Sequence, residues 1–211
     1  MIGLAFLVSS DQLINMLFGQ IMQIPQYNPI FQREISNHMY TVHSYFLAVL
    51  AQSFTCVWIY PVLLSLVSFY CFQFEYQAPS DLFTYMFALC AIAIAGNFFG
   101  LSVGTMTDDQ NVAILIGNLC TMLFNFGAGC FANTGDGANP VIKFLSWVSP
   151  MHYGVQIVFK IVSKGQIGQE YLLKQLGYEN TITFCFVYLV GFAFFSIFLG
   201  WFTLWCRNRH H

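Results

Sequence analysis

Four long stretches of this sequence contain no Asp, Glu, Lys or Arg, and they span residues 41–74, 82–106, 112–132 and 182–206. A helix needs about 20 apolar residues to cross the hydrocarbon core of a bilayer. Only 8% of the residues are charged, whereas soluble domains average roughly 25%. The mean hydropathy of +0.64 agrees with this deficit. The chain is therefore predicted to be an all-α integral membrane protein.

The N-terminal segment 1–24 is a further candidate span, although Asp11 and Gln12 interrupt it. Pro25 and Pro29 are expected to end this span, because proline lacks the backbone donor and its ring clashes with the preceding turn.

Residues 28–41 connect this first span to the next, and we call this segment the elbow. Its apolar residues recur at helical spacing, with Arg33 and Glu34 between them. That pattern predicts an amphipathic helix lying along the membrane surface. Arg33 and Glu34 then mark a surface where another protein docks and pushes on the membrane part. The alternative is that both charges belong to a solvated loop.

The next two spans are assigned to residues 42–74 and 82–106. Pro61 lies inside the first of these and predicts a kink there. Three glycines occur four residues apart in the second span, at Gly96, Gly100 and Gly104. This spacing places small side chains on one helix face and lets another helix approach closely.

Residues 133–181 differ from the spans, because they mix Gly-rich polar residues with an apolar run from residue 144 to 159. That run is too short to cross a bilayer and contains Pro150 and Gly154, which is typical of a re-entrant or interfacial helix. The architecture expected is five spans (1–24, 42–74, 82–106, 112–132 and 182–206) plus one partial insertion. The two chain ends then face opposite sides, and the Lys and Arg counts leave the orientation open.

The sequence lacks the patterns that enzymes of the common classes carry. It has no GxxxxGK[ST] phosphate loop, no His/Glu pair at zinc spacing and no GxSxG. The net charge of −2 argues against nucleic-acid binding. We therefore expect no catalytic residue, no metal ligand set and no cofactor within this chain.

Polar residues within the spans are the candidates for a transport path. An ionisable group inside a span costs roughly 2.5–3.5 kcal/mol on insertion scales and faces a cavity or a partner. Asp11 lines such a path, or else the span begins later and Asp11 lies near the surface. Asn118 and Asn125 are seven residues apart on one helix face, near Met122. They either line a cavity or form polar contacts between helices.

Several motifs occur in an order that resembles a known family. They are FQRE at Phe31–Glu34, Pro61, the Asp108–Gln110 turn, FGAG at Phe126–Gly129 and WVSPMHYG at Trp147–Gly154. Together they resemble the transmembrane domain of ABC transporters of subfamily G, the White-type pigment, sterol and multidrug half-transporters. The resemblance covers essentially the whole chain and implies the type II exporter helix bundle.

This resemblance implies roles for particular residues. Arg33 and Glu34 would couple the bundle to an ATP-binding domain on the cytosolic side, while residues 133–181 would form the outer loop. Two half-transporters would pair, as a homodimer or a heterodimer, around a central cavity. The implied cavity residues are Asp11, Ile14, Asn118, Met122 and Asn125, and the implied gate residues are Cys130 and Phe131. An Asp at residue 11, where relatives often have Asn, favours a positively charged cargo.

The family's first helix and its ATP-binding domain, which holds ATP and Mg²⁺, are missing from residues 1–211. The expected function is the membrane part of an ATP-driven exporter or flippase of lipids, sterols or other amphipathic small molecules. It would act in the plasma membrane or an organelle membrane. The alternative is a truncated membrane scaffold or dimerisation partner that does not transport. A secondary transporter is less favoured, because no internal repeat is visible.

Overall fold

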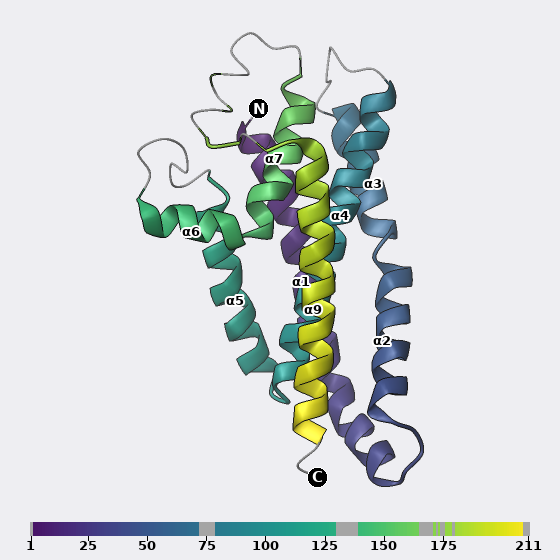
Figure 1. Ribbon diagram of the computed structural model, residues 1–211. Helices are drawn as coiled ribbons and strands as arrows, with labels where there is room; N and C mark the ends of the chain where they lie inside the picture. Colours follow the sequence, from purple (N-terminus) through teal and green to yellow (C-terminus); the bar gives the residue numbers. More distant parts are fainter. Residues whose placement is uncertain are drawn as a thin grey trace.

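The computed structural model describes residues 2–71, 79–129, 139–164, 171, 173, 176–178 and 180–208. Within these residues the chain is all-helical, as predicted from the sequence. The helices are α1 (Ile2–Ser36), α2 (Val42–Cys56), α3 (Ile59–Cys71), α4 (Pro79–Met106), α5 (Gln110–Gly127), α6 (Pro140–Val148), α7 (Pro150–Val162) and α9 (Ile182–Asn208) (Figure 1).

Four helical segments in the described part are long and apolar enough to cross a membrane: Gly3–Ser36, Val42–Tyr70, Asp81–Met106 and Ile182–Arg207. They agree with four of the five expected spans. The fifth expected span, residues 112–132, corresponds to α5, which ends at Gly127 and is not among the four. The two chain ends lie at opposite ends of the bundle (Figure 1).

Each end of the bundle has its own set of connections. At one end, α1 and α4 end, α5 begins and α9 reaches its C-terminus, and we call this the elbow end (Figure 1). At the other end, α6 lies across the tip of α5 and α7 enters the bundle, and we call this the re-entrant end (Figure 1).

The expectation that Pro25 and Pro29 end the first span is wrong. Helix α1 continues through both prolines to Ser36. Its buried face also continues past them, with Ile21, Ile24 and Phe31 each at most 3% exposed. Each proline removes one backbone hydrogen bond, and packing against neighbouring helices stabilises the helix despite that loss.

The elbow is consequently not a separate helix over residues 28–41. It consists of the last turns of α1 and a turn over residues 37–41. His38 adopts a left-handed conformation with φ 54°, which reverses the chain direction before α2 begins. Thr41 caps α2, because its side chain accepts a hydrogen bond from the Ser44 amide.

The predicted kink near Pro61 is present. Helix α2 ends at Cys56 and α3 begins at Ile59, so the break lies at residues 57–58. Pro61 cannot donate to the carbonyl of Val57, four residues earlier, and its ring clashes with that carbonyl. The helix therefore breaks one turn before the proline.

The glycine ridge of α4 packs on α1, as its spacing predicts. A Cβ added at Gly96 would lie 2.6 Å from the backbone oxygen of Leu13. A Cβ at Gly100 would collide with the backbone oxygen of Leu17. The two backbones are therefore in direct contact, and no larger side chain fits between them.

The apolar run at residues 144–159 forms parts of two helices rather than one. Ser149 takes an extended conformation (φ −77°, ψ 117°) and separates α6 from α7, as expected for a residue that precedes proline. Helix α6 exposes Phe144 and Trp147. Helix α7 is buried almost throughout.

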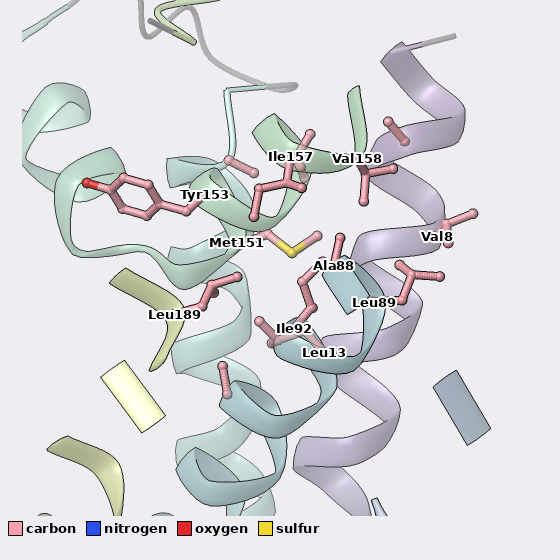
Figure 2. Close-up of a cluster of buried hydrophobic side chains, with 14 of the residues drawn as sticks. Val8, Leu13, Ala88, Leu89, Ile92, Met151, Tyr153, Ile157, Val158 and Leu189 are labelled. Atoms are coloured by element: carbon pink, nitrogen blue, oxygen red, sulfur yellow. The ribbon is translucent and has the colours of Figure 1, made fainter. Parts of the chain in front are cut away.

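Helix α7 forms the centre of the core at the re-entrant end. Its side chains at Met151, Ile157 and Val158 converge with those of Leu13 and Ile92 from α1 and α4 (Figure 2). Leu189 of α9 joins them from another side (Figure 2). This agrees with a re-entrant helix, since α7 is inserted among the spans without crossing the bundle.

We predict that Gly100→Ala destabilises the bundle by about 1–3 kcal/mol, because the added methyl group meets the backbone of α1. The measurement is the thermal unfolding of the protein in detergent. Gly191→Ala in α9 is the matched control, because a Cβ there meets nothing within 4 Å. Equal melting temperatures for both variants would show that α1 and α4 are not in backbone contact.

Candidate functional site

The elbow is organised around the carboxylate of Glu34. The hydroxyl of Tyr40 donates a hydrogen bond to this carboxylate. The left-handed turn at His38 makes the contact possible, because it folds the chain back onto the end of α1. The backbone N–H of Met39 closes the same turn by donating to the Glu34 carbonyl at 3.1 Å. The elbow is thus a closed loop rather than a free linker.

Aromatic rings stabilise this loop from the side of α2. The ring of Tyr45 lies 4.0 Å from that of Phe31, centroid to centroid. It is also nearly parallel to the Tyr40 ring, with an interplanar angle of 6°. Burial, the hydrogen bond with Glu34 and the charge of Glu34 raise the pKa of Tyr40 to about 12. The phenol therefore stays protonated and remains a donor at physiological pH.

Arg33 and Glu34 have different environments although they are adjacent. Arg33 is exposed, whereas Glu34 is half-buried. No ion pair joins them in the part of the chain that the structure describes. Neighbouring residues on a helix point in different directions, so the partner of Glu34 comes from the turn instead. Arg33 is left free to contact another protein.

A second set of contacts ties α4 to α9 at the elbow end. The guanidinium of Arg207 lies 3.1 Å from the carboxylate of Asp108 and donates to the Thr105 carbonyl at 3.2 Å. The hydroxyls of Thr105 and Thr203 are 2.9 Å apart.

The predicted cavity residue Asp11 is exposed on the side of α1. One carboxylate oxygen accepts a hydrogen bond from the Tyr60 hydroxyl at 2.6 Å, and the other accepts from the Asn15 amide at 2.8 Å. Asn15 also donates to the Tyr60 oxygen at 3.1 Å. The sequence analysis missed Asn15 and Tyr60. The four-residue spacing could have revealed Asn15, but nothing in the sequence pointed to Tyr60.

The remaining predicted cavity residues lie on α1 and α5. Asn118 and Met122 are exposed on α5, while Asn125 and Ile14 are half-buried. The opposite face of α5 packs on α1 through Gly117, where an added Cβ would lie 2.5 Å from the side chain of Ile21. The cavity itself stays a prediction. The predicted gate residues Cys130 and Phe131 lie outside the described residues.

No group of three or more His, Cys, Asp or Glu side chains that could hold a metal ion is found among the described residues.

These features define an integral membrane helix bundle with a closed elbow at one end and the buried helix α7 at the other. The sequence of residues 1–162 matches the family model described as ABC-2 type transporter. The chain therefore belongs to the ABC-2 type transporter family, the membrane domains of ABC transporters that work with nucleotide-binding domains. A search of curated proteins finds no significant match.

We predict that a polar thiol reagent labels Met122→Cys in protein whose native cysteines have been replaced. A water-filled cavity admits the reagent, whereas hydrocarbon excludes it. Phe195→Cys in α9 is the matched control, because Met122 and Phe195 are both 61% exposed in this chain. We expect labelling at residue 122 and none at residue 195. Equal resistance of both positions would place the exposed face of α5 in lipid.

Proposed function

We propose that this chain is the membrane-spanning part of a subfamily G half-transporter. In this role it exports or flips lipids, sterols or other amphipathic small molecules, driven by ATP hydrolysis on a nucleotide-binding domain. The family match supports a role in an ABC exporter. The observation that carries the finer proposal is the continuity of α1 from the exposed face at Asp11 to the elbow at Glu34.

The mechanism follows from how α1 is held. ATP and Mg²⁺ bind on the nucleotide-binding domain, which supplies the chemistry of phosphate transfer. This chain contributes a surface, with exposed Arg33 available for docking and Glu34 fixed by Tyr40. A push on this closed loop moves the end of α1 rather than deforming a flexible linker.

The packing of α1 then transmits the movement. The backbone contacts at Gly96 and Gly100 bind α1 to α4, and the hydrogen bond from Arg207 to the Thr105 carbonyl binds α9 to α4. These helices therefore shift together when the elbow moves. Because tightly packed interfaces switch between discrete arrangements, the shift can alternate the access of a cavity.

A second half-transporter, identical or different, completes the cavity in this proposal. It faces the exposed side of α1 and α5, which carries Asp11, Ile14, Asn118, Met122 and Asn125. Cys130 and Phe131 remain the proposed gate, on the family resemblance alone. The transporter acts in the plasma membrane or in an organelle membrane.

We predict that Glu34→Ala, made in the complete transporter, retains cargo binding and ATP binding but loses transport. Cargo-stimulated ATP hydrolysis should fall in parallel by roughly tenfold, the scale of a coupling free energy between two sites. Transport into membrane vesicles and ATP turnover are the two measurements. Tyr40→Phe should lower transport and ATP turnover to a smaller extent, because it removes the hydroxyl that donates to Glu34 but leaves the carboxylate in place.

Gln32→Ala is the control, since Gln32 lies two residues from Glu34 near the end of α1 and its side chain is exposed. It should transport at the wild-type rate. Wild-type transport by Glu34→Ala would show that the elbow is only a connection between spans. If the wild-type complex shows no ATP-driven transport, the alternative of a non-transporting scaffold or dimerisation partner would be favoured instead.

A further inference from the structure

The cluster of Asp11, Asn15 and Tyr60 lies at the depth of the membrane. Tyr60 belongs to the apolar span Val42–Tyr70 and lies ten residues, or roughly 15 Å of helix, from its nearer end. The 2.6 Å hydrogen bond from Tyr60 fixes Asp11 at the same depth. Asp11 is therefore not a surface residue that precedes the true start of the span.

An exposed carboxylate at this depth does not belong in contact with hydrocarbon. Ionisable residues within spans face a bundle interior or a water-filled cavity, because a bare charge in lipid is costly. Asp11 and Asn15 are both on the exposed side of α1. This side of α1 therefore faces water, cargo or a second protein rather than lipid.

Asn15 and Tyr60 hold the carboxylate of Asp11 in a fixed orientation. Asn15 donates to one carboxylate oxygen and Tyr60 to the other. Asn15 also donates to Tyr60, which orients the hydroxyl so that its own proton points to Asp11. Each oxygen has two lone pairs, and the two donors use one on each. The other two lone pairs have no donor among the described residues.

Among the described residues, no Lys or Arg forms an ion pair with Asp11. An exposed carboxylate that is oriented in advance is complementary to a positive group of a ligand.

We propose that Asp11 selects amphipathic cargo that carries a protonated amine, with Asn15 and Tyr60 as positioning residues. The inference rests on the proposed transport function and specifies its class of substrate. The ammonium group binds the free lone pairs of Asp11, and the apolar part of the cargo lies along the exposed apolar side chains of α1 and α5. Tyr60 comes from α3, so the selectivity of the site depends on a helix outside the α1–α5 pair.

The test uses two probes that share a dansyl dye and an alkyl tail. One probe ends in a primary amine, and the other is its uncharged N-acetyl form. Binding to the complete transporter in nanodiscs is measured by dansyl fluorescence without ATP, and ATP-driven uptake is measured separately in inside-out vesicles. We expect the wild type to bind the amine at least roughly tenfold more tightly, the scale of one charged hydrogen bond.

Asp11→Asn should abolish this preference and leave binding of the neutral probe unchanged, because it keeps the shape of the side chain. Tyr60→Phe should reduce the preference several-fold without affecting the neutral probe. Asp109→Asn is the matched control. It removes one negative charge at the start of α5, where either residue caps the helix, and it should keep the full preference.

Three results would overturn the inference. They are no preference for the amine in the wild type, an unchanged preference in Asp11→Asn, and an equal loss of binding of both probes in Asp11→Asn. The last result would make the cluster a structural link between α1 and α3 only. Selective binding without ATP-driven uptake would contradict the proposed function and leave the amine site intact. ATP-driven uptake of the neutral probe without a preference for the amine would support the proposed transport function and contradict the amine site.

Discussion

The contact between the backbones of α1 and α4 determines the rest of this structure. Glycines at residues 96 and 100 bring α4 against the carbonyl oxygens of Leu13 and Leu17. In lipid, helices associate mainly through such close packing, because lipid tails are as apolar as the side chains. The contact also explains how α1 stays helical across Pro25 and Pro29, since its buried face has a continuous surface to pack on.

The difference between the prolines shows how much of the fold the sequence predicts. Pro61 breaks its helix, as expected, because neither α2 nor α3 is strongly packed near residues 57–58, where most side chains are exposed. Pro25 and Pro29 have the same local chemistry but do not break α1, because buried neighbours such as Ile24 and Asn28 continue its packed face. Charge-free runs and glycine spacing are local signals. Three of the four charge-free runs correspond to candidate spans, and the glycine spacing predicted the packing of α4 on another helix. The effect of a proline depends on tertiary packing that no local pattern contains.

The same distinction applies to the polar clusters. Asp11 and Glu34 stand out in the sequence because charges are rare within or beside spans. Their partners were not predictable, because Tyr40 reaches Glu34 only after a left-handed turn, and Tyr60 reaches Asp11 from another helix. Arg33 is adjacent to Glu34 in the sequence, but neighbouring side chains on a helix point in different directions. A single sequence identifies the unusual carboxylates, whereas the fold identifies the side chains that donate hydrogen bonds to them.

The contacts of α1 also indicate which of its interfaces can change. Helix α1 packs broadly on α4 and less extensively on α2 and α3. Its contacts with these two helices include hydrogen bonds that Ser53 donates to Gln20 and that Tyr60 donates to Asp11. The rings of Phe31 and Tyr45 also join α1 to α2. Sliding α1 along the glycine ridge would force backbone atoms together. Moving α1 and α4 as one body would instead break the hydrogen bonds of α1 to α2 and α3 and would shift the packing of α3 on α4. The hydrogen bond from Tyr60 to Asp11 is one of these bonds. Glu34 lies roughly 35 Å from Asp11 along α1, and a movement that starts at Glu34 would release Tyr60 from the Asp11 carboxylate. The same movement would then reposition α1 and lower the affinity for a cation bound at Asp11.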